Sequence, residues 1–306
     1  MAATHHTANA ADGQREKPPP ESDFPIKTRL CRLPHPGSAA SWHWHDEIEI
    51  CRVRKGRVRC HTAGASVVME EEQCFFVNAG ALHMFESEPG GDGAEKETIL
   101  FSPALVAEPG SALWARYVEP LTGGRALPVF ALRGDEPWQA EAQALFDEIY
   151  HQDRTAFGWE LICRGLVCRL WLLLAGAIDG RTGAALPDSA LVNEQRAKKM
   201  LAFIHEAYRR DLTIDAIAAA ASVSRSECFR CFRRVINKKP IEYLTEYRIE
   251  RAVDLLLRTD LTITDICCQC GFSSPSYFGK VFRNMTGLPP RVFRRQRGMK
   301  AGSTPD

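Results

Sequence analysis

Apolar residues in the first third of the chain come in short runs, separated by Gly, Pro and charged residues. Three such runs, rich in β-branched and aromatic residues, are Ile48–Val53, Ser66–Met69 and Cys74–Val77. Short runs bounded by turn residues are typical of β-strands. The pattern predicts an all-β unit over about residues 24–105, which is a usual size for a barrel or a sandwich.

Beyond Pro137 the spacing of apolar residues changes to that of helices. The residues that recur at helical intervals are Trp138, Ala142, Leu145 and Ile149, and then Ile162, Leu166, Leu170 and Leu173. They predict two amphipathic helices within about residues 137–178. Arg164 and Arg169 interrupt the most apolar segment, Leu161–Ile178, and leave an uncharged run too short to span a bilayer. We therefore expect no contact with a membrane.

A segment with the composition of a linker, Gly180–Pro187, separates these patterns from an entirely helical remainder. The start of the chain contains Pro18-Pro19-Pro20 and no apolar stretch that could serve as a signal peptide. The predicted organisation is a disordered tail at 1–22, a β and helical domain at 23–180, a linker at 181–192, an all-helical domain at 193–297 and a tail at 298–306.

Charge is distributed unevenly between the two predicted domains, although the formal net charge of the 306 residues is only +1. Asn193–Lys300 contains 21 Lys and Arg against 11 Asp and Glu, and the remainder contains 18 against 27. A basic block behind an acidic one indicates a domain that binds a polyanion, joined to a separate sensing domain. The alternative is that the basic residues only form a solvated face.

The basic block contains an internal repeat of 49 to 50 residues. The matched residues are Leu212-Thr213-Ile214 with Leu261-Thr262-Ile263, Ile217 with Ile266, Ala218 with Cys267, Ser222 with Gly271, Ser224 with Ser273, Phe232 with Phe282, Arg233 with Arg283, Asn237 with Gly287, and Pro240 with Pro290. Each copy predicts a helix-turn-helix: a helix after a Thr cap, a small residue where two helices approach, a tight turn, and a second helix. We expect the second helices to begin at Ser224 and Ser273. Those helices are expected to bury Cys228 and Phe232 in the first copy, and Tyr277 and Phe282 in the second.

The opposite face of each second helix is polar and basic. Such a helix fits the major groove of DNA, where its early residues can reach base edges and its later cations can meet phosphates. The candidate DNA-binding residues are Ser224, Arg225, Ser226, Arg230, Arg233, Arg234, Lys238, Lys239, Ser273, Ser274, Ser276, Lys280, Arg283, Arg291 and Arg294.

The run CGFSSPSYFGKVFRNMTGLPPRVFRR, from Cys270 to Arg295, resembles the signature of AraC/XylS-type transcription regulators. The segment PIEYLTEYRIERAVDLLL resembles the helix that connects the family's two units. The resemblance implies that Ile241 to about Leu257 forms a rigid helix, which holds the recognition helices about 34 Å apart, one turn of DNA. Asn237 departs from the more usual Gly, but Asn tolerates the left-handed conformation.

Membership of this family would imply several partners and a mode of action. It implies promoter DNA, RNA polymerase and an unknown small-molecule effector, a homodimer built through the helices at 137–178, and a regulator that activates transcription and has no catalytic activity. Ordinary packing of those helices against the β-unit is the alternative to a dimer interface. Eleven cysteines without regular spacing, many of them in apolar runs, indicate reduced thiols in a cytoplasmic protein.

Cysteines in the helical block raise one competing interpretation. Cys228 and Cys231, or Cys267, Cys268 and Cys270, could suggest a zinc site. The repeat, however, explains several of them as packing positions, which favours buried thiols. A helical array without DNA binding would leave the basic excess unexplained.

The segment from Gly37 to Gly56 has the spacing Gly-x5-His-x-His-x3-Glu-x6-Gly, which resembles the first motif of cupin β-barrels. His43, His45 and Glu49 share parity, so on a continuous strand their side chains would leave the same face. The resemblance therefore implies a cupin-like barrel with three residues aimed at one point.

His83, in VNAGALH, lies where the second cupin motif has its histidine, although Glu72 and Asn78 replace the usual Gly and Pro. Together with the residues of the first motif it provides four candidate ligands for a divalent metal. No residue indicates which metal or which effector would bind. The alternatives are an organic-effector pocket formed by the same side chains, a vestigial site, and a metal-dependent cupin enzyme fused to a helical domain.

The predicted fold class is a two-domain α+β chain. Its N-terminal domain is a cupin-like β-barrel with a helical appendage, with the barrel over about residues 24–105 and the helices over about 137–178. Its C-terminal domain is an all-α double helix-turn-helix.

Overall fold

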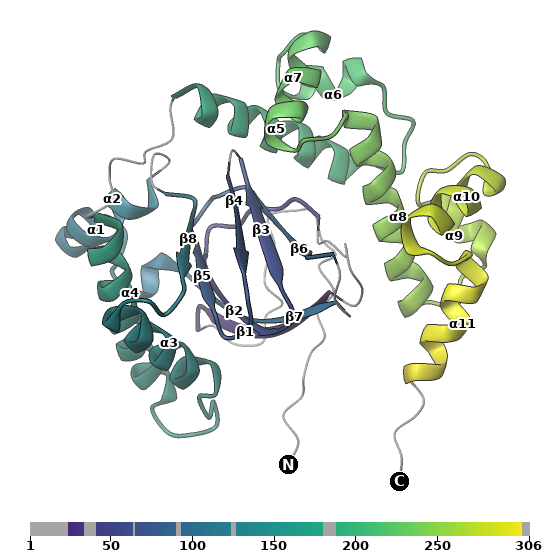
Figure 1. The fold of residues 1–306 in the computed structure, drawn as a ribbon. Coiled ribbons are helices and arrows are strands. Elements are labelled where there is room, and N and C mark those ends of the chain that lie inside the picture. Colours follow the sequence, from purple (N-terminus) through teal and green to yellow (C-terminus); the bar gives the residue numbers. More distant parts are fainter. Residues whose placement is uncertain are drawn as a thin grey trace. The chain divides into compact units, whose positions relative to one another are not determined.

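The structure is a computed structural model that describes residues 24–33, 41–63, 65–89, 93–123, 127–179 and 188–301. The predicted N-terminal tail, residues 181–187 of the predicted linker and the end of the predicted C-terminal tail lie outside these residues. The chain divides between residues 194 and 195 into two compact units, drawn in purple to teal and in green to yellow in Figure 1.

The N-terminal unit contains two antiparallel sheets. The five-stranded sheet has the order β1 (Ile26–Leu33), β7 (Ala94–Phe101), β2 (Ile48–Lys55), β5 (Cys74–Val77) and β8 (Val129–Leu132). The three-stranded sheet has the order β4 (Ala65–Met69), β3 (Val58–Thr62) and β6 (His83–Ser87). The strands predicted at 48–53, 66–69 and 74–77 are confirmed.

Strand β2 is buried along its first six residues because both of its faces are covered. Ile48 and Ile50 belong to the apolar cluster that the five-stranded sheet forms with the helices. Cys51 and Val53 belong to the cluster between the two sheets, together with Phe85 of β6. The two charged residues inside this buried stretch, Glu49 and Arg52, are each ion-paired, to Lys96 and to Glu97.

Helices cover the outer face of the five-stranded sheet (Figure 1). They are a 3-10 turn (Pro103–Leu105), α1 (Ala112–Tyr117), α2 (Glu119–Thr122), α3 (Pro137–Tyr150) and α4 (Trp159–Asp179). The two helices predicted from apolar spacing are α3 and α4, and both are confirmed.

Helix α4 is the one helix in the described part of the chain that is long and apolar enough to cross a membrane. One side of it lies in the core, where Val167, Trp171 and Leu174 are buried against the sheet. Arg164 Nε donates a hydrogen bond to Leu105 O at 3.0 Å, and Arg169 pairs with Glu141. These contacts are those of a helix packed against a sheet.

The C-terminal unit is helical throughout. Its helices are α5 (Asp188–Ala207), α6 (Ile214–Ala220), α7 (Arg225–Val235), α8 (Pro240–Arg258), α9 (Ile263–Gln269), α10 (Pro275–Thr286) and α11 (Pro290–Ala301). Helix α5 begins at Asp188, so residues 188–192, which the sequence assigned to the linker, are helical. Helix α11 likewise continues into the predicted C-terminal tail.

The two helix-turn-helix units have the predicted first helices and turns. Thr213 and Thr262 cap α6 and α9, each accepting a hydrogen bond from a backbone N–H of the first turn. Ser222 and Gly271 turn the chain with positive φ angles of 54° and 78°. Asn237, which replaces the more usual Gly, adopts φ 58°, as its tolerance of the left-handed region predicted.

The start of the second recognition helix differs from the prediction. Ser274, not Ser273, caps α10: its hydroxyl accepts a hydrogen bond from Tyr277 N at 3.3 Å, and Pro275 takes the first helical position. A proline fits there because its missing N–H would have no partner inside the helix. The residue inserted in the second copy is therefore Ser273, and the shift by one buries Phe278 and leaves Tyr277 exposed.

We predict that Gly271→Ala lowers the free energy of unfolding by about 3 kcal/mol, because positive φ and a steric clash act together. A Cβ at Gly271 would lie 2.6 Å from Tyr208 O. Gly287 is the matched control, since it has φ 77° but no atom within 4 Å of a built Cβ. Gly287→Ala should cost only about 1 kcal/mol. Urea unfolding followed by circular dichroism measures both, and equal losses would contradict the clash.

Candidate functional site

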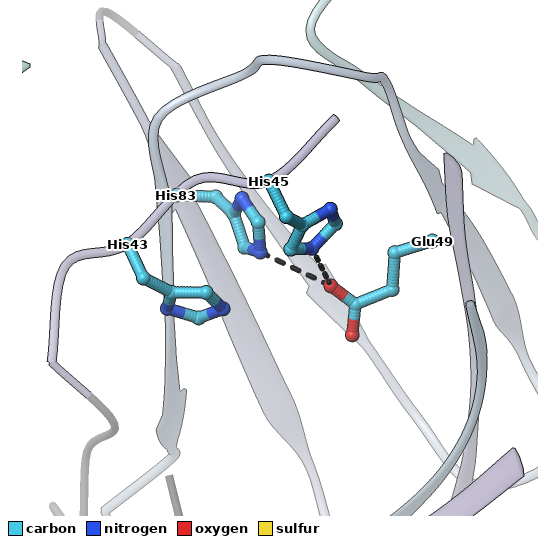
Figure 2. A group of neighbouring side chains, drawn as sticks. All are labelled: His43, His45, Glu49 and His83. Atoms are coloured by element: carbon cyan, nitrogen blue, oxygen red, sulfur yellow. Dashed lines mark hydrogen bonds and ion pairs between the residues drawn. The ribbon is translucent and has the colours of Figure 1, made fainter. Parts of the chain in front are cut away.

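Four side chains of the N-terminal unit converge on one point inside the barrel (Figure 2). They are His43, His45, Glu49 and His83, and one ligand atom from each lies within 4.8 Å of the others. Glu49 comes from β2 and His83 from the start of β6. His45, Glu49 and His83 are buried, and His43 is half-buried. The structure thus brings together all four residues named from the two cupin-like motifs.

The route by which the chain assembles this cluster differs from the prediction. No continuous strand joins the first-motif residues, because the chain bends at Asp46 and Glu47 before β2 begins. Instead His43 forms an isolated antiparallel bridge with His83, with both backbone hydrogen bonds at 3.0 Å. Shared parity along one strand was therefore the wrong reason for a cluster that does form.

The orientation of each imidazole is fixed by a backbone carbonyl. The Nδ1 atom of His43 donates to Ser41 O at 2.8 Å, that of His45 to Glu47 O at 3.0 Å and that of His83 to Ala81 O at 2.9 Å. A carbonyl oxygen can only accept, so the hydrogen of each neutral imidazole lies on Nδ1. In a neutral ring the Nε2 atom then carries a lone pair, whereas a ring that donates to Glu49 carries a proton there as well.

Two of these Nε2 atoms lie against the same carboxylate oxygen. His45 Nε2 is 3.2 Å and His83 Nε2 is 3.1 Å from Glu49 Oε2. Two ligand atoms bound at about 2.1 Å to a tetrahedral metal are about 3.4 Å apart, and two at right angles are about 3.0 Å apart. These two distances match those between ligands around a single cation.

The charge of Glu49 is balanced from the side opposite the histidines. Lys96 Nζ lies 3.0 Å from Glu49 Oε1, 2.9 Å from Thr98 Oγ1 and 3.7 Å from the centroid of the Phe85 ring. Burial would raise the pKa of Glu49, but the Lys96 ammonium and the hydrogen bonds with the two histidines outweigh it, so the pKa lies well below its usual value. Glu49 is therefore an ionised carboxylate with Oε2 available to a cation.

Burial, followed by the neighbouring imidazoles, lowers the pKa of His43 well below its usual value. His43 is thus neutral at physiological pH, as a metal ligand must be. Its ring centroid lies 4.2 Å from that of His83. A set of three imidazoles and one carboxylate suits Zn²⁺, Fe²⁺, Co²⁺ and similar transition metals.

The sequence did not single out Lys96, whose charge lies at a buried position of β7. The register places it opposite Val53, and its long side chain reaches along β2 to Glu49 Oε1 at 3.0 Å. A strand with polar and apolar residues in the order AEKETILF gives no sign of which charge faces inward. Only the pairing of the strands reveals this.

The candidate DNA-binding residues lie on α7, α10, α11 and the segments beside them. Exposed among them are Ser224, Arg225, Ser226, Arg230, Arg233, Arg234, Lys239, Ser273, Ser276, Lys280, Arg283 and Arg291, whereas Lys238, Ser274 and Arg294 are half-buried. The opposite faces of the helices lie in the core, with Phe232 and Phe282 fully buried. Each unit thus presents one polar, basic helix face.

Two residues of these helices were not named as DNA contacts. Glu227 on α7 lies 3.1 Å from Arg196 and also pairs with Arg230. Tyr277 occupies the equivalent place on α10, 50 residues later, and its side chain is 54% exposed. The misplaced insertion in the repeat concealed this equivalence.

A barrel that gathers ligand-binding side chains, joined to two helix-turn-helix units, defines a ligand-responsive DNA-binding regulator. Two family models match the chain: an AraC-like ligand binding domain over residues 29–170 and a helix-turn-helix domain over residues 217–296. The chain belongs to the AraC-type family of helix-turn-helix transcription regulators, which confirms the family, fold class and function predicted from the sequence.

Several known proteins are similar to this chain. The uncharacterized HTH-type transcriptional regulator YdeC of Bacillus subtilis is 28% identical over 256 residues, which are 83% of this chain and 85% of that one. The HTH-type transcriptional regulator ArgR of Pseudomonas aeruginosa is 41% identical over 86 residues, 28% of this chain and 26% of that one. A solved structure of ToxT from Vibrio cholerae has a TM-score of 0.49 at 12% identity and covers 88% of this chain and 98% of that one.

We predict that Lys96→Met destabilises the metal-free protein by about 3 to 5 kcal/mol, because it leaves the Glu49 carboxylate buried without its counter-charge. The double variant Lys96→Met/Glu49→Gln removes both charges and should recover about 2 kcal/mol or more of that loss. Urea unfolding of wild type, both single variants and the double variant completes the cycle. Additive losses would show that the two charges do not interact.

Proposed function

We propose that this regulator senses a divalent transition metal, or a small molecule bound to that metal, through His43, His45, Glu49 and His83, and that occupancy changes its binding to promoter DNA. The observation that carries the proposal is the convergence of three imidazole rings and one ionised carboxylate oxygen on one point. In the absence of a metal, a proton on the ring takes the place of the cation between each Nε2 atom and Glu49 Oε2.

The surroundings of the four residues also support a metal. Ligating histidines in proteins almost always donate their second ring N–H to a carbonyl or carboxylate, which fixes the tautomer. All three histidines here do so. If the metal takes more ligands than these four residues supply, a position remains for water or an organic effector. We assign that position to sensing, because the chain belongs to a family of regulators.

We further propose that α7 and α10 enter successive segments of the major groove of double-stranded promoter DNA. The residues named from the sequence would read base edges early in each helix, and the cations at the helix ends would contact phosphates. RNA polymerase would be the second partner, with activation as the outcome and the cytoplasm as the compartment. The names of two relatives, a transcriptional activator and a lactose operon transcription activator, support activation.

Helix α4 supports the proposal of a homodimer. Its outward face carries Leu161, Ile162 and Leu172, whose side chains are 76%, 52% and 65% exposed. Gly165 and Gly176 lie on the same helix, and a Cβ at either position would have no other atom within 4 Å. A second helix could therefore approach closely there. Large exposed apolar side chains beside small residues are typical of a helix–helix interface between subunits.

The proposed placement of the DNA-facing surface is tested by Arg230→Ala and Lys280→Ala. Each should weaken binding of the full chain to its own upstream DNA by about 1 to 3 kcal/mol, if the side chain contacts a base. The control is Arg116→Ala, an exposed arginine of the N-terminal unit. Fluorescence anisotropy with an excess of unlabelled random DNA gives the specific affinity, and unchanged affinity in both variants would refute the placement.

The metal proposal is tested with protein purified without a histidine tag. We expect wild type to bind one Co²⁺ per chain with a visible d–d absorption, and His83→Gln to lower the affinity by more than about tenfold. The matched control is His61→Gln. His61 is not one of the four cluster residues, and its Nε2 atom lies 3.0 Å from a carboxylate oxygen of Glu86. Absence of a bound metal in wild type, or an equal loss in both variants, would reject the centre and favour an organic-effector pocket.

A further inference from the structure

The two helix-turn-helix units differ in how their positive charges are balanced. From Ile214 to Arg251 the chain has eight Lys and Arg and five Asp and Glu, whereas from Ile263 to Lys300 it has seven Lys and Arg and one acidic residue, Asp265. The two segments are equivalent by the repeat and equal in length. Their difference in net charge therefore belongs to the acidic residues, not to the number of cations.

The acidic residues of the first unit are in contact with its cations. Arg225 lies 3.4 Å from Asp215, and Lys239 lies 3.6 Å from Glu242. Two further pairs join Arg230 to Glu227 and Lys238 to Glu246. Four of the six cations from Arg225 to Lys239 are thus ion-paired inside the unit.

Four cations of the second unit differ from these within the described part of the chain. Lys280, Arg283, Arg291 and Arg295 are exposed, and within the residues that the structure describes none of them forms an ion pair or a side-chain hydrogen bond. We propose that the two units divide the work of binding DNA: the second supplies most of the salt-dependent attraction to phosphates, and the first contributes sequence discrimination with little dependence on salt.

The physical basis is counterion release. A cation that neutralises a phosphate frees a condensed counterion, and the logarithm of the binding constant falls with the logarithm of salt concentration by about 0.9 per phosphate. A cation that is already paired must leave its carboxylate to do this. If the pair stays intact, the carboxylate comes within a Debye length of the DNA phosphates, about 8 Å at physiological salt, and is repelled by them.

Pairing also suits the first unit to reading bases. Glu227 holds the guanidinium groups of Arg196 and Arg230 on the polar side of α7. A guanidinium that is already held in place loses less conformational freedom when it binds a base edge. The Glu227 carboxylate can only accept hydrogen bonds, so it disfavours DNA sites whose base edges offer only acceptors. Tyr277, at the equivalent place on α10, is uncharged and holds no neighbouring cation in this way.

The proposal rests on the DNA-binding function and is tested with two variants of equal charge. One replaces the unpaired set (Lys280, Arg283, Arg291 and Arg295) with Gln, and the other replaces the paired set (Arg225, Arg230, Lys238 and Lys239) with Gln. Each loses four positive charges, and Arg233 and Arg234 stay unchanged in both. The full chain is titrated with a random-sequence duplex at several salt concentrations, with circular dichroism as a check on folding.

We expect the unpaired set to lower the salt slope by about 3 to 4 per bound protomer and the paired set to lower it by less than about 1. The reverse change, Asp215→Asn with Glu227→Gln, Glu242→Gln and Glu246→Gln, should raise the slope, because it frees the first unit's cations. If a fourfold variant unfolds, Lys280→Gln/Arg283→Gln is compared with Arg225→Gln/Arg230→Gln.

The outcomes separate the two levels of the argument. If wild type shows no salt-dependent binding to duplex DNA, the DNA-binding function itself fails. If wild type binds and the two sets lower the slope equally, or if removal of the acidic residues leaves the slope unchanged, the function stands and the division between the units is wrong.

Discussion

The burial of β2 on both faces is the constraint on which the N-terminal unit depends. One face needs a second sheet and the other needs helices, so the strand can be stable only at the centre of a layered unit. Glu49 lies on the inward face between apolar residues, where an ionised carboxylate is costly. The interior must therefore supply its partners, and it does so with Lys96 on one side and two histidines on the other.

Much of the fold could be predicted because its determinants are local. Thr213 and Thr262 cap their helices through contacts three residues away, and the turn at Gly271 needs a residue that accepts positive φ. Each of these requirements leaves a mark in the sequence at the place where it acts. The repeat then doubles the evidence, since the same marks recur 49 to 50 residues later.

The errors arose where a local pattern allowed two solutions. The second copy of the repeat has one extra residue, and the two copies align almost equally well whether that residue comes before or after the helix cap. Alignment alone therefore could not decide whether Ser273 or Ser274 is the cap. What separates them is steric: a cap at Ser273 would require Ser274, the residue before Pro275, to be helical, and the proline ring disfavours that conformation. The cluster in the barrel shows the converse, because its ligands were found from spacing while Lys96 and the His43–His83 bridge depend on strand pairing.

Both sites are marked by groups whose electrostatic partners are incomplete. Other buried or half-buried cations of the N-terminal unit are balanced nearby: Arg52 by Glu97 and Asp147, Arg59 by Glu88. Against that background, the cluster in the barrel holds its ring nitrogens against a carboxylate only when a proton or a metal lies between them, and the basic surface of the second unit, which has one acidic residue, repels itself. A folded chain that keeps such an imbalance loses some stability, and binding of the complementary ion removes the loss. We propose on this physical argument that the barrel is matched to a cation and the second helix-turn-helix unit to a polyanion.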